Sequence, residues 1–418
     1  MTSTPWQELQ PHSPYYLFVP QETELRAEYD RGWPVQEIFP VNSVGIVTAR
    51  DNLTIHWTPW EVMDTVKDFA KLDPETAREK YYLGKDARDW KVELAQKDLI
   101  TSGLKEELVT PVLYRPFDVR FTFYTGQTRG FICMPRPEVM GHMLSGKNLA
   151  FNLCRQIVQT SWQHILITNR ITESCYVSNM TREIGYSFPL YLYPFTKTKN
   201  SPKNQNSFLS LCEPKTPYGR KVNIAPEFLL ALEKHLRLKF TAEGRGNLET
   251  TFGPEDVFSY AYAIFHSPAY RKRYVEFLKG DFPRLPLTGN NALFAALVGL
   301  GAELVSLHLM ESPRLETFIT LFPVSGPQVV EGVRYEDNAR RVYINSEQYF
   351  EGIQPDVWAF TIGGYQVCHK WLKDRKGRTL SFEDLHHYQK IVVALAETIL
   401  LMGEIDSVIE ALGGWPLK

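Results

Sequence analysis

The chain has 418 residues, of which 44% are hydrophobic and 22% are charged. These are ordinary globular values, so composition excludes a fibrous or disordered chain, and the length allows two or three domains. A net charge of −2 does not by itself favour a nucleic-acid partner.

The charge is unevenly distributed along the chain. Residues 111–247 hold 18 Lys and Arg against 8 Asp and Glu, a net charge of +10. The flanking residues 1–110 and 248–418 have net charges of −7 and −5. A basic middle between acidic ends is typical of a localised polyanion-binding face, although an uneven solvated surface would give the same pattern.

Targeting and redox signals are few. The first thirty residues contain no cationic segment followed by an apolar core, so no secretory signal is expected. The longest uncharged stretch, residues 285–302, contains a proline and a Gly-Asn-Asn turn, which leaves too little helix for a membrane span. The cysteines are widely spaced and none lies in a C-x-x-C pair: Cys133, Cys154, Cys175, Cys212 and Cys368. We therefore expect reduced thiols in a cytoplasmic chain with no membrane partner.

Residues 1–110 are expected to form an N-terminal α/β segment that braces the rest. Residues 15–19 and 43–49 are short apolar, β-branched runs that favour strands. Residues 61–72 and 87–99 have helical periodicity, and the second run is heavily charged on its outer face.

Residues 111–222 are expected to form a β-rich, basic lobe that reads DNA. Val119, Phe121 and Phe123 alternate with polar residues, so this strand should bury one apolar face and present Arg120 on the other. Residues 148–153 and 162–168 are further strand candidates. Residues 196–222 are rich in Lys, Asn, Ser and Pro, which predicts an exposed loop or a lobe junction.

Residues 223–418 are expected to form a helical lobe with a small β insertion. Helical patterns cover 226–238, 254–266, 269–279 and 291–310, and hairpin-like runs cover 329–334 and 342–345. The terminal helix is the clearest element, because Ser381 is a good N-cap and Asp384 stands at the capping-box position. The predicted fold class is α+β, with a β-rich middle lobe packed against a predominantly helical C-terminal lobe.

Common catalytic motifs are missing from the sequence. It contains no Walker-type phosphate loop, no H-E-x-x-H, no G-x-S-x-G and no Asn/Asp-Pro-Pro-aromatic tetrapeptide. Gly299-Leu-Gly301 looks like half of a dinucleotide fingerprint, but it lies within a helical pattern, which favours helix packing. Glu213-Pro-Lys215 has the spacing of a nuclease core without a nearby upstream acidic partner, so Lys215 reads as a loop cation. We assign no catalytic residue and no metal ligand.

Several stretches in the same order resemble a known family. They are Phe39–Asp51 (FPVNSVGIVTARD), Tyr114–Arg120 (YRPFDVR), Met134–Leu144 (MPRPEVMGHML), Phe188–Pro194 (FPLYLYP), Asp256–Tyr274 (DVFSYAYAIFHSPAYRKRY) with Asp281–Pro286 (DFPRLP), and Gly363–Val367 (GGYQV) with Lys370–Lys376 (KWLKDRK) and His387–Val392 (HYQKIV). Together they resemble the C-terminal target-recognition, or specificity, region of type ISP restriction–modification enzymes and their type IIG relatives.

The resemblance implies a module that docks on an adenine-N6 methyltransferase domain and reads one asymmetric site in double-stranded DNA. In that family the helicase-like ATPase, the nuclease and the S-adenosylmethionine site lie upstream, so no cofactor is expected in this chain. The leading hypothesis is therefore a non-catalytic recognition module. The alternatives are a stand-alone metal-dependent nuclease or divergent methyltransferase, and a protein-interaction remnant without DNA affinity.

The expected DNA-binding residues are long cationic and amide side chains, because such groups bind phosphates and base edges. In the middle region they are Arg115, Arg120, Arg129, Arg136, Lys147, Arg155, Gln156, Arg170 and Arg182. A second basic run before the terminal helix adds Lys373 and Arg375. Arg115 and Asp118, three residues apart around a proline, could instead pair with each other to fix a turn.

Overall fold

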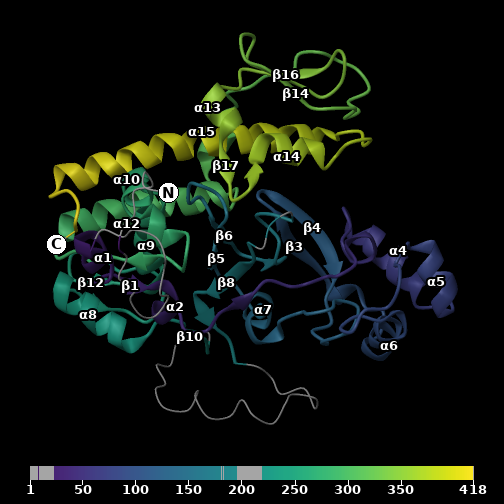
Figure 1. Cartoon of the computed structure of the whole chain (residues 1–418), viewed down its shortest axis with the longest axis horizontal. Coiled ribbons are helices and arrows are strands. Elements are labelled where there is room, and N and C mark those ends of the chain that lie inside the picture. Colours follow the sequence, from purple (N-terminus) through teal and green to yellow (C-terminus); the bar gives the residue numbers. More distant parts are fainter. Residues whose placement is uncertain (1–7, 9–22, 180, 182, 195–218, 418) are drawn as a thin grey trace, which may run out of the picture.

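The computed structural model describes residues 8, 23–179, 181, 183–194 and 219–417, and Figure 1 labels its helices and strands. The strand expected at 15–19 and most of the loop expected at 196–222 lie outside these residues. Within them the chain is α+β, with small and mostly antiparallel sheets followed by a helical C-terminal part. The expected fold class is confirmed.

The N-terminal part alternates short helices with short strands. In order these are α1 (Thr23–Tyr29), β1 (Trp33–Pro34), α2 (Val35–Ile38), β2 (Ser43–Val44), α3 (Asp51–Thr54), α4 (Pro59–Phe69), α5 (Pro74–Lys80) and α6 (Val92–Ser102). The helix expected at 61–72 is confirmed as α4, which starts at a capping box of Thr58 and Glu61. The expected helix at 87–99 is confirmed as α6, although it begins later, at Val92.

Two sheets form the middle of the molecule. The first has the order β4-β3-β7 and is built from β3 (Val109–Arg115), β4 (Asp118–Phe123) and β7 (Ile171–Thr172). The second is antiparallel, in the order β2-β8-β5-β6, and adds β5 (Ala150–Cys154), β6 (Ile165–Thr168) and β8 (Gly185–Pro189). Helix α7 (Pro137–Leu144) joins them, and β9 (Tyr191–Leu192) pairs with β10 (Lys221–Val222).

The C-terminal part is mainly helical. Its helices are α8 (Pro226–Leu236), α9 (Pro254–His266), α10 (Pro268–Arg273), α11 (Val275–Leu278), α12 (Asn291–His308), α13 (Pro355–Ala359), α14 (Val367–Lys373) and α15 (Phe382–Ala411). The helix expected at 269–279 is thus divided into α10 and α11. Ser381 and Asp384 form the expected capping box at the start of α15.

Short strands connect these helices. They are β11 (Lys239–Phe240), β12 (Thr251–Phe252), β13 (Arg284–Leu285), β14 (Arg334–Glu336), β15 (Arg341–Tyr343), β16 (Tyr349–Glu351), β17 (Thr361–Ile362) and β18 (Tyr365–Gln366). Strands β14, β15 and β16 form a small β insertion, as expected, and they project from the helical part at the top of Figure 1. The run expected at 342–345 overlaps β15, whereas the run expected at 329–334 meets β14 only at Arg334, and the sequence did not indicate β16.

Helices α9 and α12 pack closely because Gly301 has no side chain. A Cβ atom at Gly301 would lie 1.9 Å from the carbonyl oxygen of Ser259, whereas Gly299 faces open space. The Gly299–Gly301 motif is therefore a helix-packing feature, as expected. The expectation that residues 285–302 leave too little helix for a membrane span is wrong about length, because α12 continues to His308 and is long and apolar enough to cross a membrane. Half of that window is buried inside the structure, however, and the helix contacts both α9 and α15. This is the environment of a core helix.

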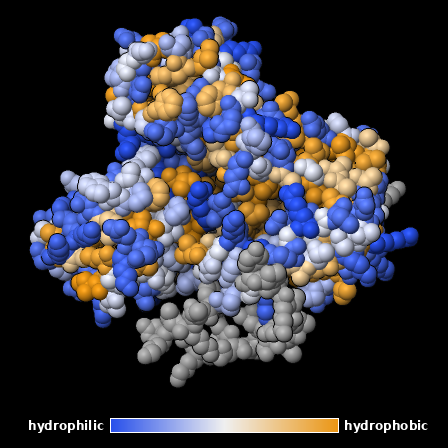
Figure 2. Space-filling view, turned by 180° about the vertical axis from the view of Figure 1, so that it is seen from behind, coloured by the Kyte–Doolittle hydropathy of each residue, from blue (hydrophilic) through white to orange (hydrophobic). Residues whose placement is uncertain are grey.

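Buried apolar side chains form two cores. The larger joins β5, β6 and β8 to the C-terminal helices, and the smaller joins α4 and α6 to β3, β4 and α7. The smaller core thus draws on both sides of residue 110. The three-part division at 110 and 222 stays a prediction. Figure 2 shows the face opposite to that of Figure 1, where a hollow with apolar side chains on its floor lies between lobes with hydrophilic surfaces.

Candidate nucleic-acid interface

Arg120 lies in the interior, so the expectation that β4 presents it to solvent is wrong. Its Nη2 atom lies 2.7 Å from Oδ2 of Asp118, and Nη2 of Arg375 lies 3.1 Å from Oδ1 of the same carboxylate. Asp118 is 1% exposed, and both arginines are buried. Burial opposes ionisation of Asp118, but Arg375 and Arg120 outweigh it and lower the pKa of this carboxyl below its ordinary value.

Trp57 covers this ionic cluster from outside. The guanidinium carbon of Arg120 lies 3.0 Å from the centre of the Trp57 ring, and that of Arg378 lies 4.2 Å from it. Arg375 stacks in turn on Trp371 of α14, 3.3 Å from the ring centre. The alternation of residue types along β4 gave a wrong prediction of the exposed face because both faces of the strand are covered. Asp118 and Arg120 are buried on the polar face, beneath residues that are distant in sequence.

Arg115 is also buried, and its carboxylate partner is not Asp118. Its Nη1 atom donates to Oε2 of Glu173 at 2.7 Å, and its guanidinium group lies 3.8 Å from the centre of the Tyr114 ring. The Tyr114 hydroxyl donates to Asp51 at 2.7 Å. Burial raises the pKa of Glu173, an effect that Arg115 opposes. Arg115, Arg120 and Arg375 are therefore structural in this arrangement, and the turn pairing of Arg115 with Asp118 is wrong.

The other expected DNA-binding residues lie at several separate places. Arg129 is exposed and pairs with Asp89 at 3.2 Å, and Arg155 is exposed and pairs with Asp281 at 3.0 Å. Lys147, Gln156 and Lys373 are exposed, and Arg136 and Arg170 are half-buried. Arg182 lies outside the described residues. Arg129 and Arg136 are brought together, since both lie near Cys133 and influence the pKa of its thiol, which burial raises.

The segment from the last residue of α14 into the loop that follows, residues 373–378, carries the clearest group of free cations; we call it the cationic loop. Lys373, Lys376 and Arg378 are exposed, and no carboxylate of the described chain forms an ion pair with them. Gly377 has φ +80°, which favours glycine, and its amide donates to Val330 O at 2.7 Å. Arg375 points inward to Asp118. The loop is therefore fixed at its centre while its charges face solvent.

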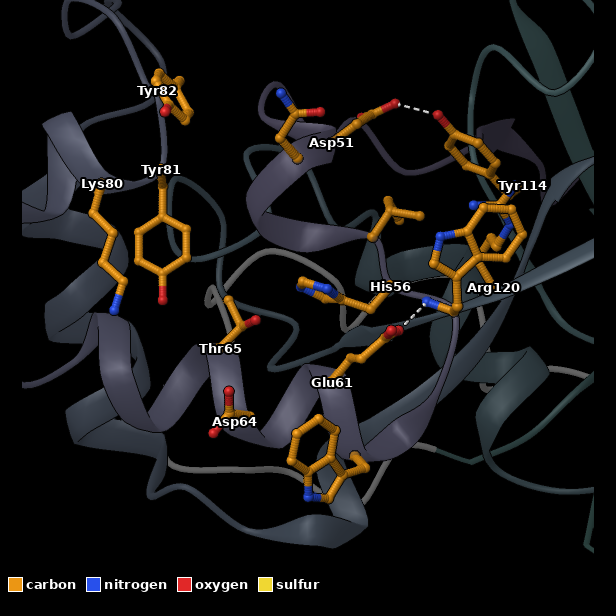
Figure 3. Close-up of a pocket in the computed structure, with 14 residues that line it drawn as sticks. Asp51, His56, Glu61, Asp64, Thr65, Lys80, Tyr81, Tyr82, Tyr114 and Arg120 are labelled. Carbon is orange, nitrogen blue, oxygen red and sulfur yellow. Dashed lines mark hydrogen bonds between the residues drawn. The ribbon is translucent and has the colours of Figure 1, made fainter. Parts of the chain in front are cut away.

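A cavity of about 620 Å³ lies beside Trp57, between α3, α4 and the residues after α5; we call it the Trp57 cavity. Figure 3 shows Glu61, Asp64 and Thr65 of α4 along one side, Lys80 and Tyr81 at one end, and Tyr114 and Arg120 at the other. Sequence reasoning missed this cavity. The closest signal is the capping box at Thr58 and Glu61, which Trp57 precedes and which has Trp60 inside it. In the part of the chain that the structure describes, no three His, Cys, Asp or Glu residues are grouped to hold a metal ion.

The fold is that of large restriction–modification enzymes. It is similar to a nuclease-deletion mutant of the Type ISP enzyme LlaGI in complex with a DNA substrate mimic (TM-score 0.63, 18% identity, 96% of this chain and 30% of that one). It is also similar to DrdV in a DNA complex (TM-score 0.67, 18% identity, 96% of this chain and 40% of that one). A third similar structure is the ATP-dependent Type ISP enzyme LlaBIII bound to DNA (TM-score 0.63, 18% identity, 90% of this chain and 24% of that one).

Residues 37–404 match the family described as Type ISP C-terminal specificity domain, and the chain belongs to that family, as its motifs indicated. No curated protein matches the chain. The chain spans between 24% and 40% of the length of the three similar structures.

Proposed function

We propose that this chain is a DNA sequence-recognition module of a restriction–modification system. It would position an adenine-N6 methyltransferase domain or subunit, and a nuclease, without catalysing either reaction itself. The observation that carries the proposal is the family match over residues 37–404, supported by similarity to three enzymes whose structures were determined with DNA or a DNA mimic. S-adenosylmethionine would then be bound by the methyltransferase and not by this chain.

The cationic loop is the strongest candidate for phosphate contacts. When unpaired exposed cations bind DNA phosphates, they release the counterions condensed on the DNA, which favours binding. A loop whose backbone is already fixed also loses little conformational freedom on binding. Lys373, Lys376 and Arg378 meet both conditions. Arg129, Arg136, Lys147, Arg155, Gln156 and Arg170 remain proposed contacts, whereas buried Arg115, Arg120 and Arg375 would act by positioning the elements around them.

Duplex binding at increasing salt tests this proposal. We expect a Kd of roughly micromolar or weaker, and a steep loss of affinity between about 50 and 200 mM salt. Replacing Lys373, Lys376 and Arg378 by Ala should reduce the magnitude of the slope of log K against log salt concentration by about two to three. Each lost phosphate contact accounts for roughly 0.9 of this slope.

The matched control replaces Lys67, Lys97 and Lys105 by Ala. These exposed lysines carry the same total charge but lie in the acidic N-terminal part. If both triple variants reduced the slope equally, only net charge would matter, and the cationic loop would have no specific role in phosphate binding. Salt-independent binding, metal-dependent cleavage of DNA or direct binding of S-adenosylmethionine would contradict the recognition module and favour an independent enzyme.

A further inference from the structure

The Trp57 cavity and the cationic loop adjoin each other through one residue. Trp57 lines the cavity, and Arg378 of the loop lies 4.2 Å from the centre of its ring. Arg120, which also lines the cavity, is paired with Asp118 at 2.7 Å, and Lys80 is paired with Asp68 at 2.8 Å. The cations that remain free therefore stand beyond Trp57, at one end of this combined site.

The wall formed by α4 and the residues before it offers hydrogen-bond acceptors. Asp64 is exposed and has no hydrogen-bond partner among the described residues. Glu61 uses only Oε2, which accepts from the amides of Trp57 and Thr58. Nε2 of His56 lies 2.9 Å from Leu53 O and must donate to it, because a carbonyl oxygen only accepts.

The second ring nitrogen of His56 is therefore also an acceptor. Burial lowers the pKa of His56, so the ring is neutral at pH 7 and Nδ1 keeps its lone pair. Together with Asp64 and Glu61, it gives the cavity three acceptor groups that protein donors do not saturate. A ligand that carries N–H donors would satisfy them.

Exposed aromatic rings border the same cavity. Trp60 is 72% exposed and Tyr82 is 89% exposed, although both line a concave site. Tyr82 has φ +53°, a left-handed conformation that is uncommon for an aromatic residue. Exposed rings of this kind are stacking surfaces for flat, heteroaromatic ligands.

We propose that the Trp57 cavity binds one nucleotide, with its base against the exposed ring of Trp60 and beside Asp64, and its phosphate toward the cationic loop. A nucleotide is complementary to this site. Adenine and cytosine carry amino donors that match the acceptors, and the phosphate is an anion that matches the cations. A simple cation would not use Arg378 and the loop lysines, and a simple anion would meet Asp64 and Glu61. A volume of about 620 Å³ is typical of a small-molecule site.

The nucleotide has two possible sources with the same chemistry. It is either a free nucleotide or one base displaced from bound DNA, as enzymes that act on bases displace their targets. The second source rests on the proposed DNA-recognition function, and the first does not. The experiment therefore has two arms.

The first arm measures binding of dCMP, dAMP and dTMP to the full chain by calorimetry. We expect dCMP and dAMP to bind about tenfold more tightly than dTMP, because thymine lacks an amino donor. Asp64→Asn should remove this preference, and Trp60→Ala should weaken all three at least fivefold. The matched controls are Glu93→Gln and Phe382→Ala, an exposed carboxylate and an exposed aromatic residue outside the cavity.

The second arm compares a fully paired duplex with one that carries a single bulged cytosine. We expect about tenfold tighter binding of the bulged duplex, lost in Trp60→Ala and Asp64→Asn and kept in the controls. A cavity-dependent effect in one arm identifies the source of the nucleotide. If neither arm changes with Trp60 or Asp64, the inference is overturned. Loss of all duplex binding with intact mononucleotide binding would instead reject the proposed DNA function alone.

Discussion

Arg375 bonds to Asp118 across 257 residues of sequence, with its Nη2 atom 3.1 Å from the carboxylate oxygen Oδ1. Asp118 begins β4 in the middle sheet, and Arg375 follows α14 in the helical part. This contact fixes the cationic loop against the β-rich lobe. The relative placement of the two regions proposed to contact DNA would therefore depend on one buried carboxylate.

Asp118→Ala should strongly destabilise the protein. Removing this carboxylate leaves Arg120 buried without a counter-charge and leaves Arg375 with only Asp384, 3.7 Å away, a loss that typically costs about 3–5 kcal/mol. The free energy of unfolding, measured with urea, should fall by that amount. Glu276→Gln, which breaks the partly exposed pair with Lys279, should cost less than about 1 kcal/mol. Similar losses in both variants would mean that the Asp118 cluster is solvated.

Gly301→Ala should destabilise the helical part, whereas Gly299→Ala should not. A Cβ atom at Gly301 meets the backbone oxygen of Ser259, so α9 and α12 must separate at a cost of about 1–3 kcal/mol or more. At Gly299 the new methyl group meets open space, and alanine favours helix by up to about 1 kcal/mol. Thermal unfolding of both variants checks the pair, and a stabilising Gly301→Ala would refute the packing argument.

Much of the fold could be predicted from local sequence patterns. The capping box at Ser381 and Asp384 starts α15 as expected, and β4 lies where alternation placed it. Local patterns indicate where an element lies, but they do not show what covers it. Arg120 was expected on the surface because the alternation assumed one solvent-facing side, and that side is covered by Trp57 and Arg375.

The candidate site was predictable only in part, for the same reason. The basic run before the terminal helix was evident, yet Arg375 turns inward while Lys373, Lys376 and Arg378 remain outside. That difference depends on Asp118, which no periodicity connects to the loop. The Trp57 cavity was missed altogether, because its walls come from three segments that meet only in the folded chain.

Acid should remove stability through Glu183. Burial would raise the pKa of this carboxyl, but hydrogen bonds from His164, Thr181 and the Val158 amide outweigh it and hold the pKa at about 2, against an ordinary 4.5. A lowered pKa in the folded state stabilises the protein above pH 4.5, and this contribution is lost as the pH falls from 4.5 towards 2.

Glu183→Gln should therefore be less stable than the wild type at pH 7, and the difference should shrink between pH 4.5 and pH 2. Urea unfolding at several pH values measures it. Glu138→Gln, at an exposed position at the start of α7, serves as the control and should leave the pH profile unchanged. A pH-independent difference between Glu183→Gln and the wild type would contradict a carboxylate role for Glu183.

Mutations should distinguish the residues that read bases from the residues that bind phosphates. Arg129 and Arg136 lie together in the basic middle, whereas Lys373 lies on the cationic loop. An arginine bidentate to guanine costs about 1–3 kcal/mol when removed and relaxes the preference at one base pair, whereas a phosphate lysine weakens all sequences alike. Arg129→Gln and Arg136→Gln should therefore change sequence preference, and Lys373→Ala should change only overall affinity.

Selection from a randomised duplex library, with the chain joined to the proposed methyltransferase partner, measures both quantities. Arg120 is unsuitable for this comparison, because its replacement disturbs the buried cluster with Asp118 and alters stability before it reports on DNA. Lys97→Ala supplies a control for loss of charge at a distant surface. If Arg129→Gln, Arg136→Gln and Lys373→Ala all lower binding uniformly across the library, the basic middle grips only the DNA backbone, and base reading must be carried by other residues.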